Sequence, residues 1–145
     1  MKLEEILESW AKDSKIDNTE LDKESLKIPS LHNKYLKMYT GENLLRKKMV
    51  HDFKEMERDK FEYYSGKLCE EDLKEHGWEQ FDHKLLKQDI PRYLESDPEL
   101  IKMLLRIDYQ KEKVEAIKSI LSSINGRSFN ISNAIKWQQF LNGIN

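Results

Sequence analysis

The sequence predicts an all-α protein, and three observations support this fold class. β-Branched residues are sparse, and no alternating apolar and polar run of the kind that marks a strand persists beyond a few positions. Apolar residues instead recur at spacings of three and four over long stretches, as on one face of a helix. Of the 145 residues, 38% are hydrophobic and 36% are charged, which suits long amphipathic helices that complete their burial by self-association. We expect one domain overall, with two long amphipathic helices and several short ones.

The first expected elements are two helical segments that precede a proline. Apolar residues at helical spacing between Leu3 and Trp10 predict a short helix. Asn18 and Thr19 are suitable N-cap residues for a second segment. Pro29 lacks the amide hydrogen that a helix interior requires, so we expect it to end or kink that segment.

The first long helix is expected between Pro29 and the pair Ser65-Gly66, which favours termination. Gly41 is a candidate interruption, because glycine costs about 1 kcal/mol relative to alanine in a helix interior. The apolar stripe of this helix follows a broken heptad and consists of Leu31, Tyr35, Met38, Leu45, Met49 and Met56.

The next segment, residues 66–97, is acidic and irregular in its apolar pattern. Gly77 and Pro91 interrupt it, so we expect short helices joined by loops. Charge alternates along the chain around this segment. Residues 28–61 carry 8 basic and 5 acidic side chains, whereas residues 62–100 carry 5 and 11. A local basic surface is therefore compatible with the net charge of −2, although basic and acidic segments of neighbouring subunits could equally pack together.

The second long helix has a strong start signal in Asp97-Pro98-Glu99, which combines a capping acid, a proline in the first turn and a first-turn acid. Asn125 and Gly126 are expected to stop it. Its stripe consists of Leu100, Leu104, Ile107, Val114, Ile117, Leu121 and Ile124.

A final short helix is expected from Asn130 or Ser132 to Gly143. It is apolar over much of its circumference, and alone it would be marginally stable. Two explanations are open: the helix folds into its own core, or it docks on a neighbouring subunit, and we favour docking. Its apolar residues are Ile131, Ile135, Trp137, Phe140 and Leu141.

Motifs for catalysis or metal binding are missing from the sequence. It has no Gly-rich phosphate loop, nucleophile elbow, HExxH or CxxC motif. Cys69, His76 and His83 are spaced too loosely for a structural zinc site. We therefore expect no enzyme activity, no cofactor and no metal. The single cysteine fits a reducing compartment, and no apolar run is long enough for a membrane span, so we expect a cytoplasmic protein.

The middle of the first long helix carries a candidate binding surface. At 100° per residue, four side chains fall within an arc of about 60° on the face opposite the apolar stripe. We call this set the basic ridge: Lys47, His51, Lys54 and Arg58. Neighbouring cations repel each other by a few tenths of a kcal/mol, so folding alone does not favour the arrangement. The ridge is either an ordinary solvated face or a surface that binds a polyanion.

Aromatic residues follow the ridge. Phe61 falls beside it on the helical wheel, whereas Tyr63 and Tyr64 do not. Single-stranded nucleic acid binds through cations on its backbone and aromatic rings stacked on its bases, which favours such a ligand here. Lys60 points toward the core side, and we expect its long side chain to reach the surface at the helix end by snorkelling.

Several stretches of the chain resemble the UvsY family, the recombination mediators of large tailed phages. The resemblance covers most of the chain and is weakest over residues 67–95. It is carried by MKLEEILE at the start, IDNTEL at 16–21, the pair Arg58 and Lys60 followed by YYSG at 63–66, and the closing NGRSFNISNAIKWQQF. In the familiar motif the lysine precedes the arginine, and a small neutral residue stands where this chain has Asp59.

The resemblance implies a protein that binds single-stranded DNA, contacts a RecA-like phage recombinase and the phage single-strand-binding protein, and helps the recombinase load onto DNA that the binding protein covers. It implies a ring-like homo-oligomer in the host cytoplasm. It assigns Arg58 and Lys60 to DNA binding and residues 131–141 to assembly. The chain would then divide functionally into 1–97, with the DNA surface and acidic connection, and 98–145, with the assembly helices.

An alternative from another class is a helical scaffold or adaptor that binds only protein partners. Its charged segments would then face those partners, and the stretch from Arg58 to Lys67 would be a helix end. Binding to bare oligonucleotides with a steep salt dependence distinguishes the two hypotheses.

Overall fold

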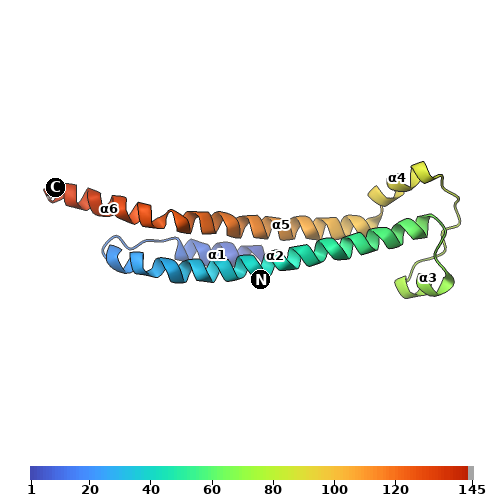
Figure 1. Ribbon diagram of the computed structural model, residues 1–145, viewed down its shortest axis with the longest axis horizontal. Coiled ribbons are helices and arrows are strands. Elements are labelled where there is room, and N and C mark those ends of the chain that lie inside the picture. The colour runs from blue at the N-terminus through green and yellow to red at the C-terminus, as the bar shows by residue number, and fades with distance from the viewer. Residues whose placement is uncertain (144–145) are drawn as a thin grey trace. The chain divides into compact units, whose positions relative to one another are not determined.

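The computed structural model describes residues 1–143, and this part of the chain is all helical, which confirms the predicted fold class. The two long helices contain 44 and 28 residues. The elements are α1 (Leu3–Asp13), α2 (Leu21–Tyr64), α3 (Glu70–His76), the 3-10 helix η1 (Lys87–Asp89), α4 (Ile90–Glu95), α5 (Pro98–Asn125) and α6 (Arg127–Leu141), as labelled in Figure 1.

Several predicted boundaries are confirmed, and their hydrogen bonds show why. Asp97 caps α5, because its Oδ1 accepts a hydrogen bond from the Leu100 amide at 3.0 Å. Helix α2 ends at Tyr64, and Gly66 follows with a φ of +73°, a conformation that suits a residue without a side chain. Helix α5 ends at Asn125, as the Asn125-Gly126 pair predicts.

The sequence predicts that Pro29 ends or kinks a helix, and the predicted end is wrong. Helix α2 runs through Pro29 and also through Gly41. Proline removes one backbone hydrogen bond from a helix interior and costs about 3 kcal/mol there. The residues around it offset this cost, because Ile28 and Leu31 pack against the core and Tyr35, two turns further on, is fully buried. Tertiary packing thus overrides the local preference.

Two helix starts also differ from the prediction. Helix α2 begins at Leu21 rather than next to Asn18 and Thr19, because Thr19 is held in a turn by Asp17. Its amide and hydroxyl donate to Asp17 Oδ1 at 2.9 and 2.6 Å. Helix α6 begins at Arg127, before the expected caps at Asn130 and Ser132.

The described residues group into two compact units, and the boundary between the units falls inside α2 and α5. The first unit contains Met1–Leu44 and the described residues from Lys111 onward, and the second contains Leu45–Gln110. These units do not follow the division at residue 97, which remains a functional prediction.

The core of the first unit joins α1, α2 and α5. Tyr35 lies at its centre, with Trp10 packed edge-on against its ring at 5.5 Å between centroids. The Tyr35 hydroxyl donates to Asp13 Oδ2 at 2.9 Å, so this buried polar group is paired. Burial and the nearby Asp13 carboxylate raise the pKa of Tyr35 to about 12. The other members of the buried cluster are Ile6, Ile117, Ile120 and Ile124.

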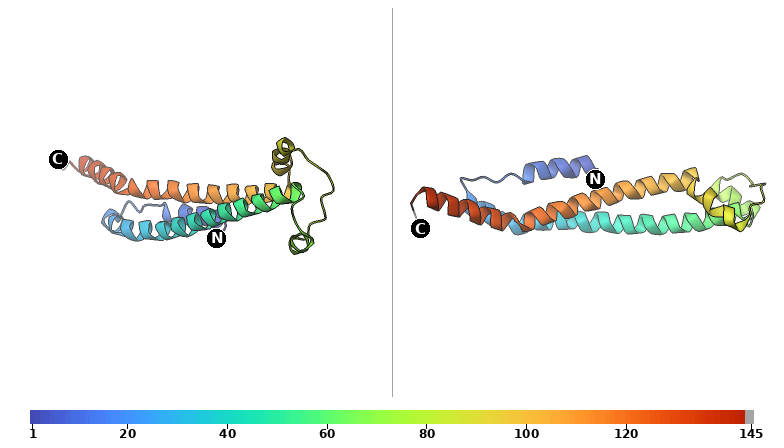
Figure 2. Two further views of the ribbon diagram at one scale, coloured as in Figure 1. Left: turned by 45° about the vertical axis from the view of Figure 1, so that its right-hand side comes forward. Right: turned by 90° about the horizontal axis from the view of Figure 1, so that it is seen from above.

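In the second unit, the C-terminal part of α2 lies beside the N-terminal part of α5, and the two run antiparallel (Figures 1 and 2). The segment between them contains α3, η1 and α4, as predicted for an irregular region of short helices. None of the helices within residues 1–143 is both long and apolar enough to cross a membrane.

Candidate nucleic-acid interface

The basic ridge lies on the exposed surface of α2 in the second unit. Lys47, His51, Lys54 and Arg58 are all exposed. Apolar side chains on other faces of the helix, such as Met56, are partly buried, so the core fixes which side of α2 faces the solvent. The structure therefore places the ridge, which consists of three cations and one histidine, on the exposed surface of one helix.

Arg58, at the C-terminal end of the ridge, is open to solvent. Its side chain is 69% exposed, and its only ion pair within residues 1–143 is a 3.4 Å contact from Nη2 to Oδ1 of the adjacent Asp59. An exposed pair of this kind contributes little and leaves the guanidinium able to bind another anion. Phe61 is exposed nearby in sequence, so its ring is also accessible.

Lys60 is buried, which corrects the expectation that it reaches the surface. Only 5% of the residue is exposed. Its Nζ lies 3.1 Å from Asp97 Oδ2 and 3.4 Å from Glu99 Oε1, so its charge is neutralised by two acids at the start of α5. A buried lysine requires such partners, because an unpaired charge away from water is costly.

Aromatic rings complete the surroundings of Lys60. Its ammonium lies 4.1 Å from the centroid of the Trp78 ring and 5.4 Å from that of Tyr63, which are cation–π distances. Tyr63 in turn contacts Trp78 and Phe81, with centroids 5.2 and 5.7 Å apart. We call this group the aromatic cluster: Tyr63, Tyr64, His76, Trp78, Phe81 and Tyr93.

Tyr63 and Tyr64 have structural partners in this cluster. The Tyr63 hydroxyl donates to the Glu79 carbonyl at 2.7 Å, and the Tyr64 hydroxyl donates to Asp97 Oδ2 at 2.6 Å. Both residues are only partly exposed, and their rings pack against other rings. Both rings thus belong to the aromatic cluster, whereas Phe61 is 41% exposed.

The buried acid and the tyrosine that binds it have shifted pKa values. Burial alone would raise the pKa of Asp97, but hydrogen bonds from Tyr64, the Leu100 amide and Lys60 outweigh it and hold the pKa below its ordinary value. Burial and the Asp97 carboxylate raise the pKa of Tyr64. Asp97 is therefore an ionised acceptor for three donors and Tyr64 is a neutral donor at pH 7.

The family model for the recombination, repair and ssDNA binding protein UvsY matches residues 9–144. The chain belongs to the UvsY family. No curated protein sequence gave a significant match.

Solved structures of the bacteriophage T4 recombination mediator protein UvsY have the same fold as this UvsY-family chain. In one crystal form the T4 protein is 21% identical with a TM-score of 0.84, and the match covers 97% of this chain and 99% of that one. In a second form the identity is 23% and the TM-score 0.83, with 97% of each chain covered. At this level of identity the likeness shows the fold alone.

Sequence reasoning missed the role of three residues around Lys60. Asp97 was recognised only as a helix cap, Glu99 only as a first-turn acid, and Trp78 not at all. The available signal was the position of Lys60 on the core side of its helix, which requires a buried acidic partner. The sequence does not specify which of the many acids in the 62–100 segment supplies it.

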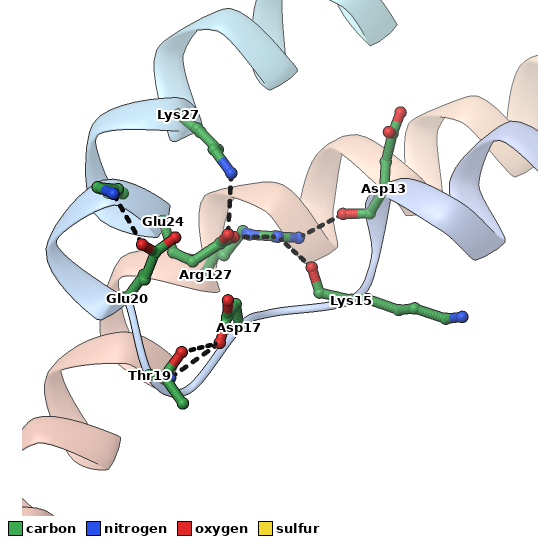
Figure 3. Close-up of polar contacts among 9 residues, drawn as sticks. Asp13, Lys15, Asp17, Thr19, Glu20, Glu24, Lys27 and Arg127 are labelled. Carbon is green, nitrogen blue, oxygen red and sulfur yellow. Dashed lines mark hydrogen bonds and ion pairs between the residues drawn. The ribbon is translucent and has the colours of Figure 1, made fainter.

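A buried arginine fixes the beginning of α6 in the first unit (Figure 3). Arg127 donates to the carbonyl oxygens of Asp13 and Lys15 at 2.9 and 3.0 Å, and its Nη2 lies 3.3 Å from Glu24 Oε2. Arg127 and Glu24 are both nearly inaccessible. The contact ties α6 to the link between α1 and α2 and also to the first turn of α2.

The predicted assembly residues of α6 lie mostly at the surface of the single chain. Ile131 is buried, whereas Ile135 is 38% exposed, and Trp137, Phe140 and Leu141 are 60–67% exposed. The Trp137 and Phe140 rings stack on each other with centroids 5.5 Å apart. Exposed aromatic residues at this density are typical of a surface that contacts another protein. Their role in assembly stays a prediction.

Within residues 1–143, no group of three or more His, Cys, Asp or Glu side chains is placed to hold a metal ion. Cys69 is a free, exposed thiol with its Sγ 3.2 Å from Asp72 Oδ2, and His76 stacks on Trp78. The residues that the sequence analysis weighed as zinc ligands thus have other neighbours in the structure.

Proposed function

We propose that this chain is a recombination mediator that binds single-stranded DNA and promotes loading of a RecA-like phage recombinase onto DNA covered by single-strand-binding protein. The observation that carries the proposal is the family match over residues 9–144, since that family is described by recombination, repair and single-stranded DNA binding. The likeness to the T4 recombination mediator supports it at the level of the fold. Such a protein would act in the cytoplasm of the host cell and would need neither a metal nor a catalytic residue.

The proposed DNA surface is the basic ridge. Lys47, Lys54 and Arg58 would contact successive phosphates, and Phe61 would stack on a base. Lys60 is buried against Asp97, so a direct contact with DNA would require a change in its surroundings. Tyr63 and Tyr64 would act mainly by supporting the helix end from within the aromatic cluster.

Assembly would strengthen the weak binding of DNA by a single chain. One ridge offers few cations on a chain with a net charge of −2. A ring-like homo-oligomer, formed through the exposed apolar side chains of α6, would repeat the ridge, so that later contacts with one DNA strand become intramolecular. The Arg127 contact would hold α6 in place for this purpose.

The test is binding of a fluorescent single-stranded oligonucleotide by anisotropy at several salt concentrations. We expect the logarithm of the binding constant to fall with the logarithm of salt, by about 0.7 for each neutralised phosphate. Arg58→Ala should lower the affinity and reduce the slope. Lys118→Ala, which removes an exposed lysine from α5 in the first unit, is the matched control and should have little effect.

The adaptor hypothesis predicts a different result in the same experiment, namely no salt-dependent binding of bare oligonucleotides. Loading is tested separately, by the lag before filament formation of a RecA-like phage recombinase on DNA covered with single-strand-binding protein. The chain should shorten this lag, and Arg58→Ala should shorten it less.

A further inference from the structure

Two hydrogen-bond donors converge on one oxygen atom beside the aromatic cluster. The Trp78 indole Nε1–H donates to Glu99 Oε1 at 2.8 Å, and the Lys60 ammonium lies 3.4 Å from the same oxygen. The Trp78 ring also lies 4.1 Å from the Lys60 ammonium, so the two donors hold each other in place. The second unit therefore contains a small preformed site for an anionic oxygen, and a side chain of the protein occupies it.

The two acids that bind Lys60 differ in how firmly the fold holds them. The Asp97 side chain is 1% exposed and accepts hydrogen bonds from Tyr64 and from the Leu100 amide as well as from Lys60. The Glu99 side chain is 51% exposed. Asp97 thus belongs to the core, whereas Glu99 lies at the border between the site and the solvent.

We propose that the site of the Glu99 carboxylate is a phosphate subsite for single-stranded DNA, in which Glu99 is an internal competitor of the DNA backbone. The inference rests on the proposed function and adds Trp78 and Glu99 to it. A phosphodiester oxygen accepts the same two hydrogen bonds as the carboxylate oxygen, and both ligands carry one negative charge. When Glu99 swings outward, Lys60 gains access to the solvent on the side that Glu99 covered.

The subsite lies near the end of α2 that carries Arg58. Lys60 is one turn from the end of α2 and two residues after Arg58, the last member of the basic ridge. Two positions correspond to about 200° around a helix, so the subsite lies on the other side of α2 from Arg58. A strand on the ridge would reach it by passing around the end of the helix, one turn beyond Lys60. Lys60 would keep its ion pair with Asp97, because an ammonium has three donors and Asp97 uses only one.

The test compares oligonucleotide binding by the wild type and by Glu99→Ala. Removing the competitor should tighten the dissociation constant about ten- to hundredfold, which is the scale of one hydrogen bond to a charged group. It should also steepen the salt dependence by about 0.7 for each phosphate gained. Glu95→Ala is the matched control, since it removes the same charge from an exposed residue at the end of α4 that is outside the ion pairs of Lys60.

A second variant tests whether Trp78 provides the other donor. Trp78→Phe keeps an aromatic ring beside Lys60 but removes the indole N–H. When it is combined with Glu99→Ala, Trp78→Phe should abolish most of the gain in oligonucleotide affinity. The helical circular dichroism should stay unchanged. Retention of the full gain would overturn the role of Trp78.

The outcomes separate this inference from the proposed function. If the wild type binds with a phosphate-dependent slope and Glu99→Ala binds no more tightly than Glu95→Ala, the subsite is overturned while the proposed function stands. If neither the wild type nor Glu99→Ala binds single-stranded DNA, both are overturned. A gain confined to Glu99→Ala and dependent on Trp78 supports the subsite.

Discussion

The Lys60 ammonium lies 3.1 Å from the Asp97 carboxylate in a pair whose side chains are 6% and 1% exposed. This contact joins the end of α2 to the start of α5 in the second unit. It also gives different environments to Arg58 and Lys60, which the sequence resemblance treats as one DNA-binding pair. Arg58 is open to solvent and can meet DNA directly, whereas Lys60 is a structural cation in the wild-type fold.

The first prediction is that Lys60→Ala and Arg58→Ala differ strongly in stability. Lys60→Ala leaves the Asp97 carboxylate buried without its cation, so it should lower the free energy of unfolding by about 3–5 kcal/mol. Arg58→Ala removes an exposed side chain and should change it by less than about 0.5 kcal/mol. Urea unfolding followed by circular dichroism at one protein concentration measures both values.

The double variant Lys60→Met with Asp97→Asn is the control for this prediction, because it removes both charges at once. It should be more stable than Lys60→Ala alone. Equal stability of Lys60→Ala and Arg58→Ala would contradict the buried pair. The same result bears on DNA binding, since a loss of affinity in Lys60→Ala is interpretable only when the variant is shown to be folded.

The second prediction concerns the stability of the fold at acidic pH. The pKa of Asp97 is held below its ordinary value of 3.8 in the folded chain. The ionised group therefore stabilises the fold fully above the unfolded pKa, and this contribution is lost as the pH falls through the folded pKa. Asp97→Asn should be clearly less stable than the wild type at pH 7, and the difference should shrink below about pH 4.

Urea unfolding of both proteins at pH 7, 5 and 3 measures that difference. If the difference in free energy of unfolding between the wild type and Asp97→Asn stays constant down to pH 3, ionisation of Asp97 does not stabilise the fold. Asp89→Asn, at an acid that is only partly buried and outside the Lys60 network, is a suitable comparison and should show little change.

The helices were largely predictable from the sequence, because they depend on local signals. Asp97-Pro98-Glu99 starts α5 and Ser65-Gly66 follows the end of α2, as their backbone preferences require. Pro29 misled the prediction, because its cost is local but the packing of Ile28 and Leu31 that offsets it is tertiary. A sequence pattern indicates the local cost of the proline but not the tertiary packing that offsets it.

The candidate site was only partly predictable for the same reason. The exposed ridge follows from helical geometry, since Lys47, Lys54 and Arg58 share one face of α2 whatever the rest of the chain does. The environment of Lys60 depends on residues far along the chain. Trp78 lies 18 positions after Lys60, and Asp97 and Glu99 lie 37 and 39 positions after it. No local periodicity specifies such distant partners.

The third prediction concerns the Arg127 contact. Arg127→Ala leaves two backbone carbonyls and one buried Glu24 oxygen without this donor, so it should lower the free energy of unfolding by about 3 kcal/mol. Lys27→Ala is the control, because Lys27 pairs with the same Glu24 but is 65% exposed, and it should cost less than about 1 kcal/mol. If Arg127→Ala and Lys27→Ala lower the free energy of unfolding equally, in thermal or urea unfolding, Arg127 does not fix the start of α6.

The fourth prediction is that the exposed face of α6 mediates assembly. Trp137→Ser combined with Phe140→Ser removes two large rings that stack on each other at the surface, so it should leave the helical content unchanged and reduce the size of the oligomer in sedimentation velocity. Because a ring repeats the basic ridge, the smaller species should also bind a long single-stranded oligonucleotide at least tenfold more weakly, while an oligonucleotide that spans one ridge should be affected much less. Leu26→Ser is the matched control, since Leu26 is 81% exposed on α2 and lies outside the predicted assembly residues. If the double variant sediments like the wild type, α6 is not the assembly surface, and the ridge must then bind DNA without help from that helix.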